Sequence, residues 1–314
     1  MITTLTGDNS WALQQELNAI VSGFIASHGE LAVERIDGEE ADFVHIQESL
    51  TSLPFLVSKK LVVLRIPSAN KKFVDEIEAL LNDSTETTEV VIVEPKLDKR
   101  LNYYKYLKKN TEFKEFLQLD FNGLSRWLIQ SAKKQGGTIT SNDARYLLER
   151  IGPNQQLLAN ELEKLLLHDT KISRQSIDLL TEPTPQSTVF QLLEAAFAGN
   201  AKRTLQLYHE QRQLKVEPLQ IVAMLTWQLH VLAVIKTAAD RTPAQIAKEA
   251  HLSPYVVQKS IGIARHMTIA ELKKHIENLL TIDVRSKRDG IDIDEALQHY
   301  LLTLAVLNRT GERS

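Results

Sequence analysis

The sequence contains no cysteine in its 314 residues, which excludes disulfide bonds, thiol catalysis and cysteine-based metal sites. Glycine is scarce, with 12 residues, and leucine is abundant, so the composition favours helices. An excess of positive charge is also missing, since 37 Lys and Arg residues face 40 Asp and Glu residues. Proteins that hold DNA mainly through its phosphates are usually basic, so we expect any contact with nucleic acid to be local or shared with partners.

A hydrophobic run long enough to cross a membrane is missing as well. The most apolar stretch, 219–235, is interrupted by Gln220, Gln228 and His230, and a spanning helix needs about 20 apolar residues. The first ten residues, MITTLTGDNS, are polar and lack the apolar centre of a signal peptide. Together with the absence of cysteine, these features predict a soluble, cytoplasmic protein without a membrane partner.

Strand and helix patterns alternate over the first 120 residues. The runs 61–66 and 90–93 are almost entirely apolar, as in parallel strands that are buried on both faces. This alternation predicts a parallel, doubly wound α/β sheet in a first domain, 1–120. The predicted strands are 2–5, 31–36, 61–66, 90–93 and 113–119, and the predicted helices are 11–24, 39–50, 71–81 and 97–109.

Strand patterns stop after residue 120, and helical patterns continue to the end of the chain. Thr140 begins a capping box before one apolar stripe, and Asn154 can cap the next. Two prolines block helix continuation within 181–187, which we interpret as a linker. These features predict a small helical domain at 121–182.

The last domain is predicted at 187–308 and contains only helices. Pro218 suits the first turn of the long apolar helix 219–235, which we expect to form the core. Further helices are expected near 270–281 and 292–306, followed by a flexible tail at 309–314.

The first strand leads into Thr6-Gly7-Asp8-Asn9-Ser10-Trp11, at the position where related α/β folds bind phosphate through backbone N–H groups. A phosphate-binding P-loop needs two glycines followed by Lys and Ser or Thr. This turn has one glycine and no lysine, and Asp8 brings a negative charge. We therefore predict a structural turn in which Asp8 or Ser10 caps the first helix, rather than an ATP site.

Residues that carry catalysis or hold metal ions show no recognisable arrangement. The nine histidines form no HExxH pattern, and a GxSxG motif is absent. Glu94 ends a predicted strand where an ATPase acid would lie, and without a P-loop we interpret it as a strand-end carboxylate. The sequence thus predicts no catalytic residue, no metal site and no cofactor.

Four segments form a pattern that runs over nearly the whole chain. They are SLPFLVSKKLVVLR at 52–65, VVIVEPKLDKRLNYYKYLKK at 90–109, LANELEKL at 158–165 and DVRSK at 283–287. Their order and spacing, together with the missing P-loop, resemble the delta subunits of the bacterial DNA polymerase III clamp loader. The resemblance implies a degenerate AAA+ module, formed by the first two domains, followed by a helical collar domain that joins the subunits into a ring.

The resemblance also implies a function. Delta subunits do not bind ATP; they bind and open the sliding clamp (beta) for loading onto primed DNA during replication, as non-catalytic parts of a DNA-directed DNA polymerase holoenzyme. The implied partners are the clamp, the tau/gamma and delta-prime subunits through the collar, and primed DNA within the assembled complex. The implied clamp-binding residues, of which Phe55 and Leu56 take the inserting positions, are Leu53, Pro54, Phe55 and Leu56.

Basic residues and tyrosines are interleaved at 96–109, a pattern found in nucleic-acid binding. The candidate DNA-proximal face consists of Lys99, Arg100, Lys105 and Lys108. We favour a solvated helix face for these residues, with the lysine stems lying along apolar surface.

The segment 242–259 resembles a helix-turn-helix, with a corner packed by Ile246, Ala247, Leu252 and Val257. A DNA-binding regulator, or a helical scaffold, is therefore the alternative function. The second helix of this pair carries only Gln258 and Lys259 as base-reading residues, which is few for sequence recognition.

Overall fold

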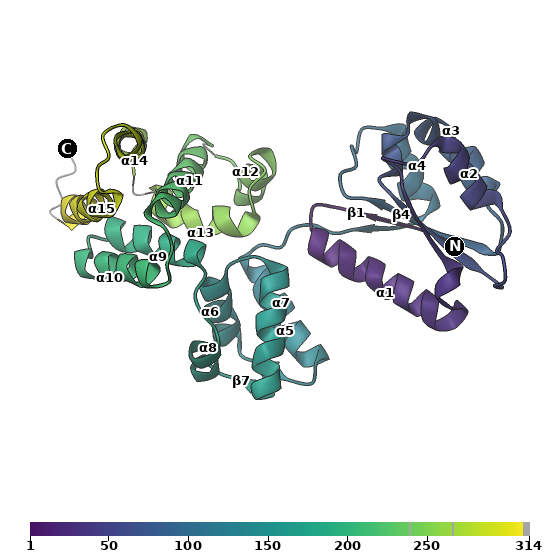
Figure 1. Cartoon of the computed structure of the whole chain (residues 1–314), viewed down its shortest axis with the longest axis horizontal. Helices are drawn as coiled ribbons and strands as arrows, with labels where there is room; N and C mark the ends of the chain where they lie inside the picture. Colours follow the sequence, from purple (N-terminus) through teal and green to yellow (C-terminus); the bar gives the residue numbers. More distant parts are fainter. Residues whose placement is uncertain (239, 266, 310–314) are drawn as a thin grey trace. The chain divides into compact units, whose positions relative to one another are not determined.

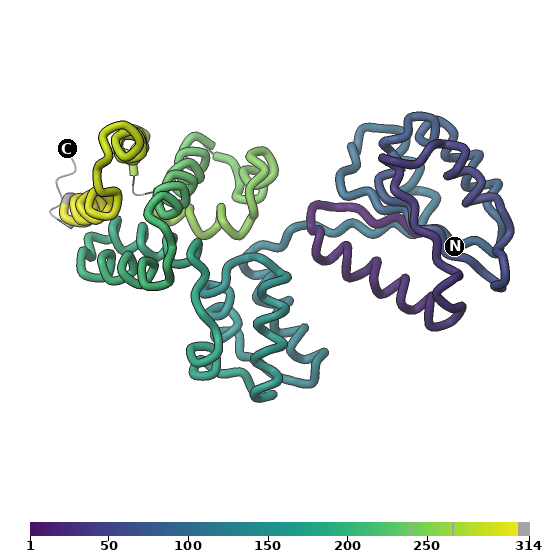
Figure 2. The backbone as a smooth tube through the Cα atoms, in the orientation of Figure 1, coloured from purple at the N-terminus to yellow at the C-terminus, as the bar shows by residue number. Residues whose placement is uncertain are grey.

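The computed structural model describes residues 1–238, 240–265 and 267–309 (Figure 1). The chain forms two compact units, Met1–Gln118 and Leu119–Ser314. The backbone passes through the first unit and then enters the second without returning (Figure 2). Of the predicted tail at 309–314, residues 310–314 lie outside the described residues.

The first unit is built on five strands that all pair in parallel, in the order β2-β3-β4-β1-β5. The sheet confirms the predicted parallel α/β fold. The central strands are apolar throughout because helices cover both faces of the sheet. The strands are β1 (Ile2–Thr6), β2 (Val33–Asp37), β3 (Lys60–Arg65), β4 (Thr88–Glu94) and β5 (Glu112–Glu115).

Helices lie on both faces of this sheet (Figure 1). On one face, α1 (Ser10–His28) packs against the alternate side chains Leu61 and Val63 of β3. On the other face, Val62 and Leu64 contact a core shared with three helices. These helices are α2 (Phe43–Thr51), α3 (Lys71–Asn82) and α4 (Asn102–Asn110).

Several predicted boundaries in this unit are wrong by a few residues. The predicted helix 39–50 begins at Phe43 because the side chain of Asp42 caps it, accepting a hydrogen bond from the His45 amide at 2.8 Å. The predicted helix 97–109 begins at Asn102, and the predicted strand 113–119 ends at Glu115. The start of the predicted strand 31–36 is instead the end of a short 3₁₀ turn, η1 (Glu30–Ala32).

The second unit begins with four helices around one apolar cluster: α5 (Phe121–Lys134), α6 (Ser141–Ile151), α7 (Gln155–His168) and α8 (Arg174–Leu180). Thr140 and Asn154 cap α6 and α7, as predicted from the sequence. The capping box expected at Thr140 is different in detail, because the Asp143 carboxylate accepts from the Thr140 hydroxyl at 2.6 Å. A short parallel pair, β6 (Thr138–Ile139) and β7 (Lys171–Ile172), was not predicted.

Most of the remaining helices form a second cluster around α11 (Pro218–Thr237), whose buried stripe includes Val222, Leu225 and Leu229. Ile246, Ala247 and Val257 form a smaller cluster of their own. Within the described part of the chain, α11 is the one helix long and apolar enough to cross a membrane, but its apolar residues pack into this core. The other helices are α9 (Pro185–Phe197), α10 (Ala201–Gln213), α12 (Pro243–Glu249), α13 (Pro254–Arg265), α14 (Ile269–Arg288) and α15 (Ile293–Arg309).

The predicted linker at 181–187 is partly wrong, because Pro185 takes the first turn of α9 and Thr184 caps that helix. The predicted division between 121–182 and 187–308 stays a prediction. Tyr255, which belongs to α13, packs into the first helical cluster and stacks on Phe121 with ring centroids 5.7 Å apart.

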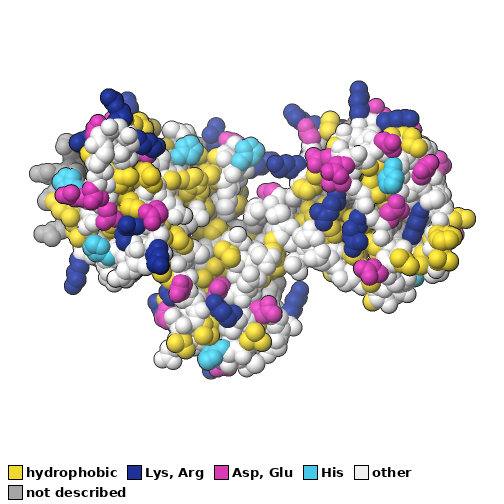
Figure 3. All heavy atoms as spheres, viewed as in Figure 1, with side chains coloured by type: hydrophobic (Ala, Val, Ile, Leu, Met, Phe, Trp, Pro, Cys, Tyr) yellow, Lys and Arg dark blue, Asp and Glu magenta, His cyan; other side chains and the backbone are white. Residues whose placement is uncertain are grey.

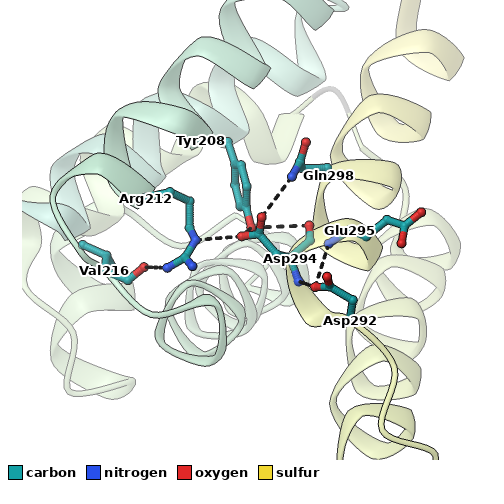
Figure 4. A network of polar contacts seen from close by, with 7 residues as sticks. All are labelled: Tyr208, Arg212, Val216, Asp292, Asp294, Glu295 and Gln298. Carbon is teal, nitrogen blue, oxygen red and sulfur yellow. Dashed lines mark hydrogen bonds and ion pairs between the residues drawn. The ribbon is translucent and has the colours of Figure 1, made fainter.

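A polar network joins α10 to the start of α15 (Figure 4). The Asp294 carboxylate accepts hydrogen bonds from the Tyr208 hydroxyl at 2.6 Å and from Arg212 Nε at 2.7 Å. Arg212 also donates to the carbonyl oxygen of Val216 at 2.6 Å. Burial opposes ionisation of Asp294, but these hydrogen bonds outweigh it and hold the pKa of the carboxyl below its usual range. The network fixes the last helix against the rest of this cluster.

Candidate binding loop at one end of the sheet

The loop between α2 and β3, residues 52–59, exposes three large apolar side chains. Leu53, Phe55 and Leu56 are 73%, 83% and 80% exposed. Single exposed apolar residues are common on soluble proteins, whereas several within four consecutive positions indicate a surface that binds a partner. The side chains of Phe55 and Leu56 therefore do not fold back beneath the sheet.

The backbone of this loop is restricted at two positions. Pro54 fixes its own φ and favours an extended residue before it. Leu56 has a φ of 61°, in the left-handed region that costs a residue with a Cβ about 1–2 kcal/mol. A leucine stays in this conformation only where the surrounding structure holds it there.

Three residues at the end of the loop, each with a different kind of contact, hold it to the sheet. Val57 is half-buried against the α1 side of the sheet. Lys59 forms an ion pair with Glu89 at 3.2 Å, and both side chains are partly exposed. Lys60 is buried, and its Nζ donates to the carbonyl oxygen of Ser49 at 2.7 Å and to the Ser52 hydroxyl at 2.9 Å. Burial lowers the pKa of Lys60, and the charge of the Glu34 carboxylate opposes this shift.

Leu31 adds a further exposed apolar side chain at the same end of the sheet. It is 86% exposed and precedes β2, which pairs with β3 through Val33 and Leu61. The start of β2 and the α2–β3 loop lie at the same end of the sheet, because neighbouring parallel strands begin on the same side. Sequence analysis missed Leu31 because it reads as the first apolar residue of a strand.

The opposite end of the sheet holds the turn Thr6–Ser10, and this turn is filled by the chain after β5. The Asn9 amide donates to the Phe116 carbonyl oxygen at 3.1 Å, and the Asp8 carboxylate accepts from the Gln118 amide at 2.8 Å. A Cβ added to Gly7 would lie 2.0 Å from the Phe116 carbonyl oxygen, so the two segments are in close contact. Groups that would face a phosphate in a P-loop are used within the protein.

The cap of α1 corrects a prediction. Asn9 caps the helix, accepting a hydrogen bond from the Ala12 amide at 3.0 Å, and the expected caps Asp8 and Ser10 do not. The reason is that the Asp8 carboxylate faces Gln118 instead, while Ser10 is already the first residue of the helix.

Glu94 lies buried at the end of β4, as a strand-end carboxylate. One oxygen accepts from the Ser68 amide at 2.8 Å and from the Tyr103 hydroxyl at 3.1 Å, and the other accepts from the Ser68 hydroxyl at 2.9 Å. Burial raises the pKa of this carboxyl, and the Ser68 and Tyr103 hydrogen bonds partly reverse the shift. Both oxygens are therefore committed to holding β4 against its neighbours.

The candidate basic face is divided between two kinds of environment. Lys99 and Arg100 precede α4 and are paired, with Glu115 at 2.5 Å and Asp98 at 2.6 Å. The hydrogen bonds from Arg100 lower the pKa of Asp98 to about 2. Lys105 and Lys108 are exposed on α4 itself.

Two of the three tyrosines of α4 are not available for stacking on bases. Tyr103 and Tyr104 are buried, and the Tyr103 hydroxyl is bonded to Glu94. On the face of the molecule that Figure 3 shows, Lys and Arg side chains are interspersed with Asp and Glu side chains, and neither kind forms a continuous patch of its own. The solvated helix face expected from the sequence stays a prediction, which the burial of Tyr103 and Tyr104 supports.

The helix-turn-helix resemblance corresponds to α12 and α13, but α13 is packed rather than free. Its residues Tyr255, Val257 and Ser260 are buried, and the Ser260 hydroxyl accepts a hydrogen bond from the Gln228 side chain at 2.9 Å. A recognition helix must present one face to the DNA groove. The predicted corner residues Ile246, Ala247, Leu252 and Val257 do pack together. The alternative function is nevertheless not favoured, because α13 is also packed against α5 and α11.

The fold is that of a clamp-loader subunit. The solved structure of the Bacillus subtilis DNA clamp loader delta protein matches with a TM-score of 0.82 at 22% identity, covering 97% of this chain and 95% of that one. A RuvB Holliday junction branch migration motor of Thermotoga maritima matches with a TM-score of 0.38 at 10% identity over 83% of this chain and 79% of that one, which is too low to define a shared fold.

Family comparisons cover almost every part of the chain. The model for the DNA polymerase III delta subunit matches residues 4–117, and the model for the C-terminal domain of that subunit matches 186–304. A middle-domain model matches 120–179. The curated DNA polymerase III subunit delta of Bacillus subtilis (strain 168) is 22% identical over 325 residues, 98% of this chain and 94% of the relative. The chain belongs to the family of DNA polymerase III delta subunits.

Proposed function

We propose that this chain binds a bacterial sliding clamp through Leu53, Phe55 and Leu56 and opens it for loading onto primed DNA. It acts in the cytoplasm as the delta subunit of a clamp loader, with tau/gamma and delta-prime subunits as the neighbours of its C-terminal helices. The observation that carries the proposal is the exposure of three large apolar side chains on a short, anchored loop in a member of the delta family.

The energy available from the loop is of the right order for a stable contact. Full burial of a Phe or Leu side chain is worth about 1.5–3 kcal/mol, so Phe55 and Leu56 together supply about 3–6 kcal/mol. Such residues are the usual hot spots of an interface. Swinging a two-state ring from closed to open takes about 5.5 kcal/mol of differential binding, so neighbouring contacts contribute to opening.

The subunit contributes no ATP hydrolysis in this proposal. Support comes from the turn Thr6–Ser10, whose amide and carboxylate groups are bonded to the segment after β5. Support also comes from Glu94, whose two oxygens are engaged by Ser68 and Tyr103. ATP bound by neighbouring subunits then controls when the loop reaches the clamp.

The test is co-elution of the purified chain with its cognate sliding clamp in size-exclusion chromatography. The variant with Phe55→Ala and Leu56→Ala is expected to elute apart from the clamp while keeping its fold and its assembly with the other loader subunits. A matched control replaces two exposed leucines at the other end of the sheet, Leu101→Ala and Leu117→Ala, and should co-elute. Normal binding by the loop variant would show that the contact lies elsewhere.

A further inference from the structure

Lys60 occupies a position where an apolar residue is expected. It is the first residue of β3, a strand whose next four residues are buried and apolar, and it is itself 7% exposed. A buried ammonium group is unfavourable unless it is hydrogen-bonded and near a compensating charge. The structure supplies both, which indicates a specific role for this lysine.

The hydrogen bonds of Lys60 join the two ends of the α2–β3 loop. Its Nζ donates to the carbonyl oxygen of Ser49 at 2.7 Å, in the last turn of α2, where carbonyl groups lack helical partners. It also donates to the hydroxyl of Ser52 at 2.9 Å, the residue that ends the helix and begins the loop. Lys60 directly follows the loop, so these two hydrogen bonds hold the end of the loop against its beginning. We call this arrangement of Lys60, Ser49 and Ser52 the clip.

A third hydrogen bond connects Ser49 to the neighbouring strand. The Ser49 hydroxyl donates to the Glu34 carboxylate at 2.6 Å, and Glu34 lies on β2 next to β3. The carboxylate supplies the negative charge that the buried ammonium group needs. The end of α2, the start of the loop and two strands thus meet at one buried cation.

We propose that Lys60 is a positioning residue for clamp binding, whose buried ammonium group holds the α2–β3 loop closed so that Leu53, Phe55 and Leu56 are presented in their exposed arrangement. This inference rests on the proposed function. Without the clip, the loop samples wider conformations, and ordering it on the clamp opposes binding even though the apolar side chains are unchanged. In this proposal, Lys60 raises clamp affinity by fixing the conformation of the loop, and its ammonium group makes no direct contact with the clamp.

Replacing Lys60 tests the proposal. Lys60→Met keeps the aliphatic stem and removes the ammonium group, and we expect it to weaken clamp affinity about ten-fold in calorimetry or surface-based kinetics. Amide exchange in 53–58 of the free chain should become faster, while β3 and β4 stay protected. Lys72→Met is the matched control, because it removes an exposed lysine of the same unit that pairs with Glu76 on α3, outside the loop, and it should bind like the unchanged chain.

A double-mutant cycle separates positioning from general destabilisation. If Lys60 acts through the loop, Phe55→Ala weakens binding less in the Lys60→Met background than in the unchanged chain. Additive effects in this cycle would contradict the proposal, as would unchanged affinity and exchange for Lys60→Met. If Lys60→Met does not fold, Ser52→Ala decides, since it removes one of the two bonds at an exposed residue; affinity lowered a few-fold supports the clip and unchanged affinity rejects it.

The outcome also distinguishes this proposal from the proposed function. Loss of binding in the Phe55→Ala and Leu56→Ala variant, with normal binding in Lys60→Met, would reject the clip and keep the clamp contact. Normal binding in all of these variants would reject the contact site itself, and with it the positioning role.

Discussion

The two ends of the parallel sheet differ in what they offer to a partner. At the end where β1 leads into α1, the turn Thr6–Ser10 is bonded to the segment after β5, and a side chain on Gly7 would collide with Phe116. At the other end, the α2–β3 loop exposes Leu53, Phe55 and Leu56. Open α/β sheets usually bind ligands at the carboxyl ends of their strands. Here the first turn at that end is filled by the protein's own chain, and the binding surface that we propose lies at the opposite end.

The two ends therefore use their polar and apolar groups differently. At the first turn, the Asn9 amide and the Asp8 carboxylate are bonded to the segment after β5. An apolar loop can then act without disturbing the sheet, because its side chains contribute little to the core. We therefore expect substitutions in the filled turn at 6–10 to change the free energy of unfolding, and substitutions in the α2–β3 loop to change the affinity for the clamp. We call these the closed end and the open end of the sheet.

Of the substitutions that compare the two ends, one at Gly7 should have the largest effect on stability, because the chain after β5 fills the first turn. Gly7 has a φ of 119°, and the Cβ of Gly7→Ala would lie 2.0 Å from a backbone oxygen. We expect this change to destabilise the α/β unit by about 3 kcal/mol, measured by hydrogen exchange of the β1 and β5 amides. The control is Gly23→Ala in α1, where an added Cβ meets nothing within 4 Å and should be neutral or stabilising. Equal effects of the two changes would show that the turn is not closed.

Leu56→Gly should separate affinity from stability at the open end. Glycine adopts a φ of 61° without the strain that leucine has there, so we expect the free energy of unfolding to change by less than about 1 kcal/mol. In the proposed complex the Leu56 side chain is buried against the clamp. Its removal should therefore weaken clamp affinity by about ten-fold or more, measured by calorimetry. A large loss of stability without a loss of affinity would place Leu56 in the core instead.

Charge reversal on α4 should have a small effect. Lys105→Glu and Lys108→Glu together change two exposed residues of α4 outside the α2–β3 loop, and we expect clamp affinity to stay within a few-fold. Binding is measured at two salt concentrations, because any long-range effect of these charges must weaken with salt. An affinity lowered by more than an order of magnitude would identify α4 as the contact.

ATP should have no measurable effect on the isolated chain. The Asn9 amide is already bonded to the Phe116 carbonyl oxygen, and the Asp8 carboxylate, which accepts from the Gln118 amide, brings negative charge to the turn. Titration calorimetry is expected to give no binding heat at micromolar ATP with Mg²⁺, with an ATP-binding subunit of the loader as the positive control. Saturable micromolar binding would contradict the closed state of this end.

Much of the fold could be predicted because the central strands of the sheet are continuous apolar runs in the sequence. The continuous run of β3 and β4 indicates strands buried on both faces, and the parallel order follows from the helices between them. Boundaries were less accurate where a local cap decides them, as Asp42 does for α2. The helix α10 was missed because its pattern has few apolar residues, of which Leu207 and Tyr208 are buried.

The binding loop was predicted from its resemblance to a family, and its exposure could not be derived from the pattern. Pro-Phe-Leu before a buried strand fits either a core loop or a contact loop, and only the structure shows that Phe55 and Leu56 are exposed. The role of Lys60 could not be predicted, because its partners Ser49 and Ser52 come close only when the loop closes. The packing of α13 was hidden for the same reason, since its buried face contacts helices distant in sequence.

The most direct test places a photoreactive residue at each end of the sheet in turn. Benzoylphenylalanine is introduced at Phe55 in one protein and at Ser10, an exposed position of the closed end, in the other. After irradiation with the cognate sliding clamp, we expect a cross-link from position 55 that excess unlabelled chain suppresses, and none from position 10. A cross-link from position 10 alone would contradict the account, since it would place the clamp at the end that the protein closes.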